Sequence, residues 1–136
     1  MIFIDTGAIV GRLVTRDQYH LAATDFWNEL ASAEVSCITT NLVMAEALTL
    51  VGRRTSYRFA AEQARELYSS DILRITRPTH TDEINAVNLF EKFSDQRVSF
   101  VDCVSFVVMR RHKVEEVFGF DQHFSSAGFV LKPTQL

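Results

Sequence analysis

The chain has 136 residues, of which 47% are hydrophobic and 23% are charged, and its formal net charge is −3. This length and composition are typical of one soluble globular domain with a substantial core, which we expect to span residues 1–136. Residues 1–11 contain no positively charged leader, and every apolar run is interrupted well before about 20 residues, so we expect neither a signal peptide nor a membrane span.

Short β-favouring runs alternate along the chain with longer segments of helical periodicity. Residues 2–4 (IFI) favour a buried strand, and the DTG sequence at 5–7 favours a turn after it. Ser, Thr or Asn before an apolar period marks several helix starts. In chain order, the expected elements are a strand at 2–4, a helix at 16–33, a strand at 35–39, a helix at 41–54, a helix from 56 to at least 67, a strand at 72–76, a helix from 79 to about 93, a helix at 99–112, and strands at 116–120 and 129–131.

This alternation of strands and helices predicts an α/β fold, a three-layer sandwich in which a parallel sheet is covered by helices on both faces. Right-handed crossovers would place the C-terminal ends of the strands along one edge, where ligand sites of such sheets open. The two cysteines, Cys37 and Cys103, lie within apolar segments, and no Cys/His spacing resembles a zinc site. We therefore expect both to be reduced core residues, as suits a cytoplasmic protein.

Four carboxylates follow the expected strands or begin the helices behind them. Asp5 ends the first strand, Glu46 lies about one turn into the helix after the second strand, Asp102 lies early in an apolar helix, and Asp121 follows the run VFGF. Taken singly, each has a structural explanation. Asp5 and Asp121 suit turns, Asp102 suits a helix start, and Glu46 suits a narrow polar stripe on its helix.

Taken together, the four carboxylates would converge on one edge of the sheet. Clustered carboxylates repel one another unless a cation lies between them. Oxygen ligands without Cys or His select Mg²⁺ or Mn²⁺. Such an ion activates a water molecule and neutralises charge that develops on a phosphate and its leaving oxygen. The pattern therefore indicates phosphoryl chemistry.

The sequences around these residues resemble the PIN-domain ribonucleases, and most closely the toxin subunits of VapBC-type toxin–antitoxin pairs. The resemblance covers essentially the whole chain, and its motifs are IDTGA at Asp5, TNLVMAE at Glu46, SFVDCV at Asp102 and GFDQHF at Asp121. It implies a four- or five-stranded parallel sheet and metal-dependent endonucleolytic cleavage of RNA. The four acidic residues would then bind Mg²⁺ or Mn²⁺ or orient the ligands. Thr6 would supply a supporting hydroxyl, although a turn threonine explains it equally well.

Basic and aromatic residues supply candidate contacts for RNA and for protein partners. Arg53 and Arg54 form a basic cluster with Arg58, and Arg53 lies two turns beyond Glu46 on the same helix face, so we expect Arg53 and Arg54 to contact RNA phosphates. The basic residues at 110–113 are better explained as favourable charge at a helix C-terminus. We expect His123 to be a surface residue rather than a general base.

The resemblance also implies two protein partners, a cognate antitoxin and a second copy of the chain in a homodimer. The 11 phenylalanines should mostly be core residues. Any that stay exposed on helices, among them Phe90, Phe93, Phe100 and Phe106, would form a patch suited to such a partner.

Three alternatives stay open at this point. An isolated PIN domain can be a housekeeping RNA-processing nuclease, or a binding module without catalysis. A signalling receiver domain has the same length, a parallel sheet and an acidic Mg²⁺ pocket, and the FVLKP sequence at 129–133 resembles its strand end. That class needs a phosphorylatable aspartate after the third strand, where this chain has Arg77, Pro78 and Thr79.

Overall fold

The sheet of this protein is five-stranded and parallel throughout, with the order β3-β2-β1-β4-β5. The fold is that of a computed structural model, which describes residues 1–134, so the last two residues of the expected domain lie outside it. The strands are short: β1 (Ile2–Ile4), β2 (Cys37–Thr40), β3 (Leu73–Thr76), β4 (Glu116–Phe118) and β5 (Val130–Lys132). The predicted α/β fold is confirmed, and of the four or five parallel strands expected the sheet has five.

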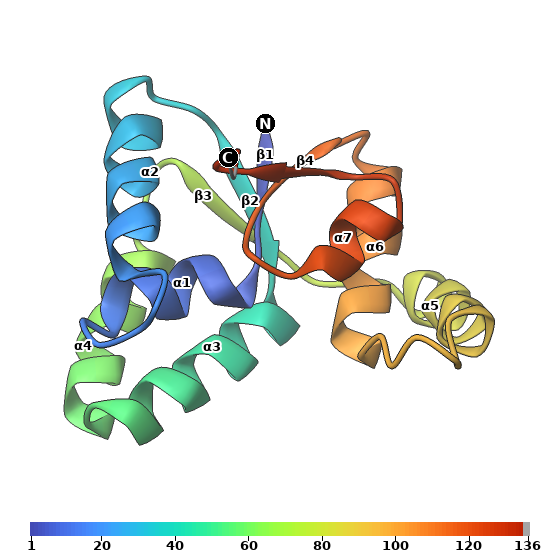
Figure 1. The fold of residues 1–136 in the computed structure, drawn as a ribbon, viewed down its shortest axis with the longest axis horizontal. Helices are drawn as coiled ribbons and strands as arrows, with labels where there is room; N and C mark the ends of the chain where they lie inside the picture. Colours follow the sequence, from blue (N-terminus) through green and yellow to red (C-terminus); the bar gives the residue numbers. More distant parts are fainter. Residues whose placement is uncertain (135–136) are drawn as a thin grey trace.

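Helices cover both faces of the sheet, with α1–α4 gathered on one side and α5–α7 on the other (Figure 1). Their bounds are α1 (Thr6–Leu13), α2 (His20–Ser32), α3 (Asn41–Arg54), α4 (Tyr57–Tyr68), α5 (His80–Lys92), α6 (Phe100–Arg111) and α7 (Gln122–Ser126). In the part of the chain that the structure describes, none of these helices is long and apolar enough to cross a membrane.

Four helices begin where the sequence indicates a cap. The hydroxyls of Thr40, Ser56, Thr79 and Ser99 each accept a hydrogen bond from the backbone N–H three residues later. At the start of α5, Asp82 also accepts a hydrogen bond from the backbone N–H of Thr79 and completes a capping box. These local bonds satisfy N–H groups that a helix cannot satisfy internally, which is why the starts of α3–α6 could be read from the sequence.

The first helix differs from the prediction. The expected turn after Asp5 is wrong, because α1 begins directly at Thr6, and the helix expected at 16–33 begins only at His20. The α1 sequence TGAIVGRL is rich in glycine and β-branched residues, which form helices poorly in isolation. Packing against α2 supports the helix instead. A Cβ at Gly11 would lie 2.9 Å from the Cβ of Ala23, and the indole N–H of Trp27 donates to the carbonyl of Ala8 at 2.9 Å.

The central strand β1 carries the core and places the first aspartate. Phe3 and Ile4 are fully buried. The Thr39 hydroxyl of β2 donates to the Ile4 carbonyl at 2.7 Å, and the backbone N–H of Asp5 donates to the Phe118 carbonyl at the end of β4 at 2.9 Å. Asp5 is therefore held from both neighbouring strands at the C-terminal edge of the sheet. Elsewhere, Cys37 and Cys103 are buried free thiols, as expected.

Candidate active site

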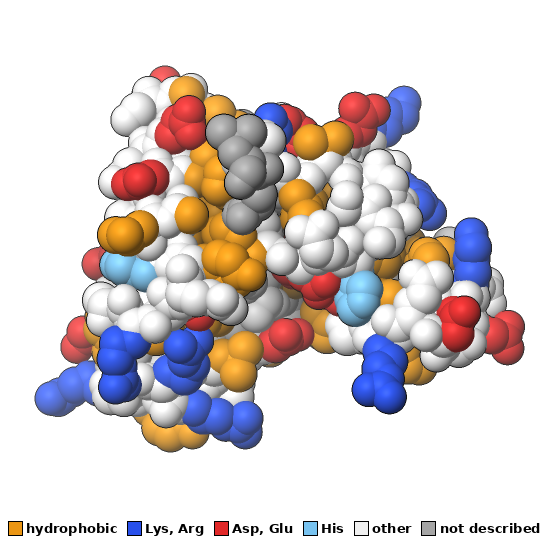
Figure 2. Space-filling view, viewed as in Figure 1, with side chains coloured by type: hydrophobic (Ala, Val, Ile, Leu, Met, Phe, Trp, Pro, Cys, Tyr) orange, Lys and Arg blue, Asp and Glu red, His pale blue; other side chains and the backbone are white. Residues whose placement is uncertain are grey.

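A pocket of about 450 Å³ opens at the C-terminal edge of the sheet, and all four predicted carboxylates line it. Asp5, Glu46, Asp102 and Asp121 come from the end of β1, from α3, from α6 and from the segment after β4. Thr6 lines the same pocket. Figure 2 shows acidic side chains gathered in the middle of this face beside a histidine, with basic side chains around α3 and α4. The structure thus brings together residues that are up to 116 positions apart in sequence (121 − 5).

Asp5 is the most enclosed member of the cluster, and Glu46 is the most open. Asp5 is 5% exposed, and the backbone after β4 packs closely against it. A Cβ at Gly119 would lie 3.0 Å from the Cβ of Asp5 and 3.3 Å from its Oδ2, so glycine is what allows this approach. Glu46 is exposed at the pocket wall. It therefore lies on the polar side of its helix and also lines the pocket.

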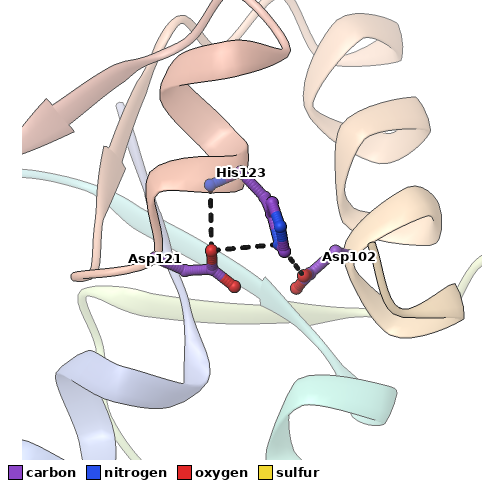
Figure 3. A group of neighbouring side chains, drawn as sticks. All are labelled: Asp102, Asp121 and His123. Carbon is purple, nitrogen blue, oxygen red and sulfur yellow. Dashed lines mark hydrogen bonds and ion pairs between the residues drawn. The ribbon is translucent and has the colours of Figure 1, made fainter. Parts of the chain in front are cut away.

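Asp102 and Asp121 face each other across the pocket, and His123 lies with them (Figure 3). Ligand atoms of these three residues lie within 4.8 Å of one another. His123 Nδ1 is 3.2 Å from Asp121 Oδ1 and 3.8 Å from Asp102 Oδ2. His123, expected to be a surface residue rather than a general base, is half-buried and lines the pocket, because the first turn of α7 brings its ring back to the carboxylates.

Burial and the charges of neighbouring carboxylates raise the pKa of Asp5, Glu46 and Asp102. Burial, followed by the charge of Asp102, raises the pKa of Asp5 well above its usual range, and Asp121 and Glu46 raise it further. Burial and then the charge of Asp121 raise the pKa of Asp102 to about 7. Burial and the charge of Asp121 also raise the pKa of Glu46. An acidic cluster of this kind is costly in its charged form, and a divalent cation would remove that cost.

The donor set fits a divalent metal ion. Asp5 and Asp102 are held firmly by buried surroundings, and the backbone N–H of Asp102 donates to the Ser99 hydroxyl at 3.1 Å, which fixes the first turn of α6. The carboxylate oxygens of the cluster are hard ligands of the kind that bind Mg²⁺ and Mn²⁺. Which of these residues would touch the ion stays a prediction.

The two arginines at the end of α3, Arg53 and Arg54, differ in how they are placed relative to the pocket. Arg54 Nη1 donates to Oδ2 of the pocket residue Asp17 at 2.8 Å, whereas Arg53 is exposed at the end of the same helix. The roles of both in RNA binding stay predictions. Arg97, in the segment before α6, lines the pocket and was not singled out from the sequence. Neither the sequence around Arg97 nor its spacing from other residues identifies it as a pocket residue, because only the folded loop brings it to the pocket.

The basic residues at the end of α6 have partners within the protein. Arg111 forms a two-pronged pair with Asp82 of α5, with nitrogen–oxygen distances from 2.7 to 3.1 Å. Arg110 donates to the carbonyl of Ala127 at 2.9 Å and lies over the ring of Phe129. These contacts join α6 to its neighbours, so the two arginines serve the fold, in keeping with their interpretation as helix-end charge.

A parallel sheet of this order, with acidic residues from β1, α3, α6 and the end of β4 at one edge, defines a PIN domain. The family model described as PIN domain matches residues 2–130, and this chain belongs to that family. The sheet order also excludes a receiver domain, whose strands run 2-1-3-4-5.

Known members of the family match the chain over nearly its whole length. The chain is 35% identical over 130 residues to the 23S rRNA-specific endonuclease VapC20 of two Mycobacterium tuberculosis strains, with 96% of each chain covered. The crystal structure of Mycobacterium tuberculosis VapC20, described as a sarcin–ricin loop cleaving toxin, matches with a TM-score of 0.87 and 32% identity, covering 96% of this chain and 97% of that one.

Proposed function

We propose that this protein is a metal-dependent endoribonuclease and the toxin of a toxin–antitoxin pair. The observation that carries the proposal is the convergence of Asp5, Glu46, Asp102 and Asp121 in one open pocket. A Mg²⁺ or Mn²⁺ ion held there would activate water and stabilise the charge that develops on the scissile phosphate. The chain's own part is to hold the carboxylates at fixed positions and to admit an RNA strand from solvent.

The four carboxylates would contribute differently. Asp5 and Asp102 are buried and fixed by backbone contacts, so they suit direct and lasting contact with the ion. Asp121 is less enclosed and Glu46 is exposed, so they would hold the ion less rigidly than the two buried aspartates. Thr6, which follows Asp5 at the start of α1 and lines the pocket, would support it with its hydroxyl.

The decisive experiment compares cleavage of RNA by the wild type and by two aspartate variants. Wild type should cut in Mg²⁺ or Mn²⁺ and stop cutting when EDTA is added. Asp102→Asn should fold normally by circular dichroism and should not cut. Asp25→Asn, which changes an exposed aspartate of α2 outside the pocket, should cut like the wild type. A folded Asp102→Asn protein with full activity would overturn the proposed mechanism.

The proposed substrate is large-subunit ribosomal RNA at the sarcin–ricin loop, because the relatives matched along the whole chain are named for that RNA. Mapping of the 5′ ends after digestion of total RNA should place the main cut in that loop. A main cut in another RNA would refute this substrate. Processing of precursor RNA without an effect on growth would favour the alternative of a housekeeping RNA-processing nuclease. Induced expression should arrest growth with the wild type and not with Asp102→Asn.

Contacts with RNA phosphates are proposed for Arg53 and Arg54, which continue α3 beyond Glu46. Arg54 is 42% exposed and stays beside the pocket through its bond to Asp17. Arg97, which lines the pocket, would contact the same RNA strand. Such contacts position the RNA and do not read its sequence.

The proposal includes two protein partners and a cytoplasmic location, where RNA is found and the free thiols stay reduced. Among the phenylalanines considered for a contact surface, Phe106 is fully buried, but Phe90 is 48% exposed. Ile84 and Val87 precede it on α5 at intervals of three residues and are 50% and 49% exposed. This apolar stripe supports a homodimer, and Phe90→Ser should shift the protein toward monomer in light scattering. An antitoxin is proposed from the family alone.

A further inference from the structure

The ring of His123 meets the acidic cluster through a buried nitrogen that makes no hydrogen bond. His123 Nδ1 is buried, although the side chain as a whole is 34% exposed, and it faces Asp121 Oδ1 at 3.2 Å, a contact that is an ion pair only when the ring is protonated. Buried polar atoms in proteins are nearly always partnered, so a buried orphan nitrogen needs an explanation. The other histidines within the described residues do not line the pocket, and Nδ1 of His20 lies 2.8 Å from the Gly11 carbonyl.

Backbone contacts fix the position of His123 next to the acidic cluster. Asp121 caps α7 by accepting a hydrogen bond from the backbone N–H of His123 at 2.9 Å, so the two residues form one unit. The next residue, Phe124, is fully buried and packs edge-to-face on Phe106 of α6. This anchor holds the first turn of α7 against the helix that carries Asp102.

The spacing of the three side chains fits a common ion. Ligands about 2.1 Å from one ion lie about 3 Å apart when adjacent and about 4.2 Å apart when opposite. His123 Nδ1 lies 3.2 Å from an oxygen of Asp121 and 3.8 Å from an oxygen of Asp102, within that interval (Figure 3).

We propose that Nδ1 of His123 is a ligand of the metal ion, so that the site prefers transition ions such as Mn²⁺ to Mg²⁺. This inference rests on the proposed function, because it assumes that the acidic pocket binds a divalent ion. Mg²⁺ takes oxygen ligands and keeps its waters, whereas first-row transition ions accept an imidazole nitrogen readily. One nitrogen ligand among the carboxylate oxygens would therefore shift the metal preference of the site toward Mn²⁺, with the same carboxylates in place.

Pulsed electron paramagnetic resonance of bound Mn²⁺ tests the ligand directly and does not depend on activity. Wild type should show the echo modulation of a directly bound ¹⁴N, and this signal should convert to that of ¹⁵N when histidine is labelled with ¹⁵N. His123→Gln should lose it, and His80→Gln, which changes a histidine of α5 outside the pocket, should keep it.

Calorimetric titration gives the matching change in selectivity. His123→Gln should weaken Mn²⁺ binding about tenfold or more and leave Mg²⁺ binding nearly unchanged, since a water molecule can replace the nitrogen on Mg²⁺. Bound Mn²⁺ without nitrogen modulation in the wild type would overturn the inference and leave the carboxylate site standing. Failure of the wild type to bind either ion would overturn both this inference and the proposed metal dependence.

Discussion

Replacing Asp102 with asparagine should stabilise the metal-free protein at pH 8 even though it abolishes catalysis. Burial and the charge of Asp121 raise the pKa of Asp102 from 3.8 to about 7 in the folded protein. A carboxyl group whose folded pKa lies above its unfolded pKa destabilises the fold once the pH exceeds the unfolded value. The penalty grows as the pH rises and reaches its full size above the folded pKa.

The size of the effect follows from the shift. A difference of about three pKa units corresponds to at most about 4 kcal/mol of folding free energy. The nearby carboxylates relax around a neutral residue 102, which reduces the effect. We therefore expect Asp102→Asn to raise the free energy of unfolding by about 2 kcal/mol at pH 8, which corresponds to several degrees in Tm. The bond between Ser99 and the backbone N–H of residue 102 is kept, because it does not use the substituted side chain. At pH 5 the gain should be smaller than at pH 8, and it should disappear only as the pH falls below the unfolded pKa of 3.8.

Asp82→Asn is the matched control, because Asp82 is equally buried but has the opposite electrostatics. Burial would raise the pKa of Asp82, but the bonds from Arg111 and from the Thr79 backbone outweigh it and lower the pKa. This stabilisation is present above the unfolded pKa and is lost as the pH falls through the folded pKa. Asp82→Asn should therefore be less stable than wild type at pH 8, by about 1–3 kcal/mol.

The assay is urea denaturation in EDTA at pH 8 and pH 5, followed by circular dichroism. The expected result at pH 8 is a shift of opposite sign for the two variants. If Asp102→Asn is as destabilised as Asp82→Asn at pH 8, the acidic cluster is not repulsive in the absence of metal, and the reasoning fails.

Three further predictions concern the site and its ligands. Gly119→Ala should lower turnover about tenfold or more with little loss of stability, because the new Cβ displaces Asp5 by a few tenths of an ångström. Gly7→Ala is the control, because its new Cβ has ordinary contacts at 3.5 Å and should leave activity intact. Equal kinetics for the two variants would refute the idea that Gly119 fixes the position of Asp5. Mn²⁺ or Mg²⁺ at 100 times its Kd should add about 2.7 kcal/mol of stability in thermal unfolding, and less below pH 6, where protons compete with the ion; an unchanged Tm in millimolar metal would exclude the site. Arg53→Ala and Arg54→Ala should each reduce the salt dependence of RNA binding by about one ion, and an unchanged slope would remove them from the interface.

The sequence was sufficient for the sheet and for most helix starts, because both depend on local signals. Alternating apolar runs indicated the strands, and Thr40, Ser56 and Ser99 act through side-chain bonds to residues three positions away. The same reasoning missed α1 and α7. Packing supports α1, with Gly11 placed for close approach to α2, and α7 is a five-residue helix whose periodicity is too short to detect.

The residues of the candidate site also divide into those that the sequence identifies and those that it does not. The four carboxylates could be selected because topology alone sends the ends of parallel strands to one edge. His123 and Arg97 could not be placed, since each reaches the pocket through the path of a loop or of one helical turn. Only the two-residue interval from Asp121 to His123 was available as a signal, and without α7 it does not show whether the ring turns inward.

The position of β1 in the sheet has a consequence for how the protein comes into being. The strand β1 lies at the centre, and one of its two partners, β4, comes far later in the chain, with Ile2 opposite Glu116. A chain still being synthesised therefore keeps one side of β1 unpaired, and Asp5 lacks both its bond to Phe118 and the nearby Asp121. The pocket can therefore assemble only after β4 and the segment that carries Asp121 have been synthesised and have paired with β1.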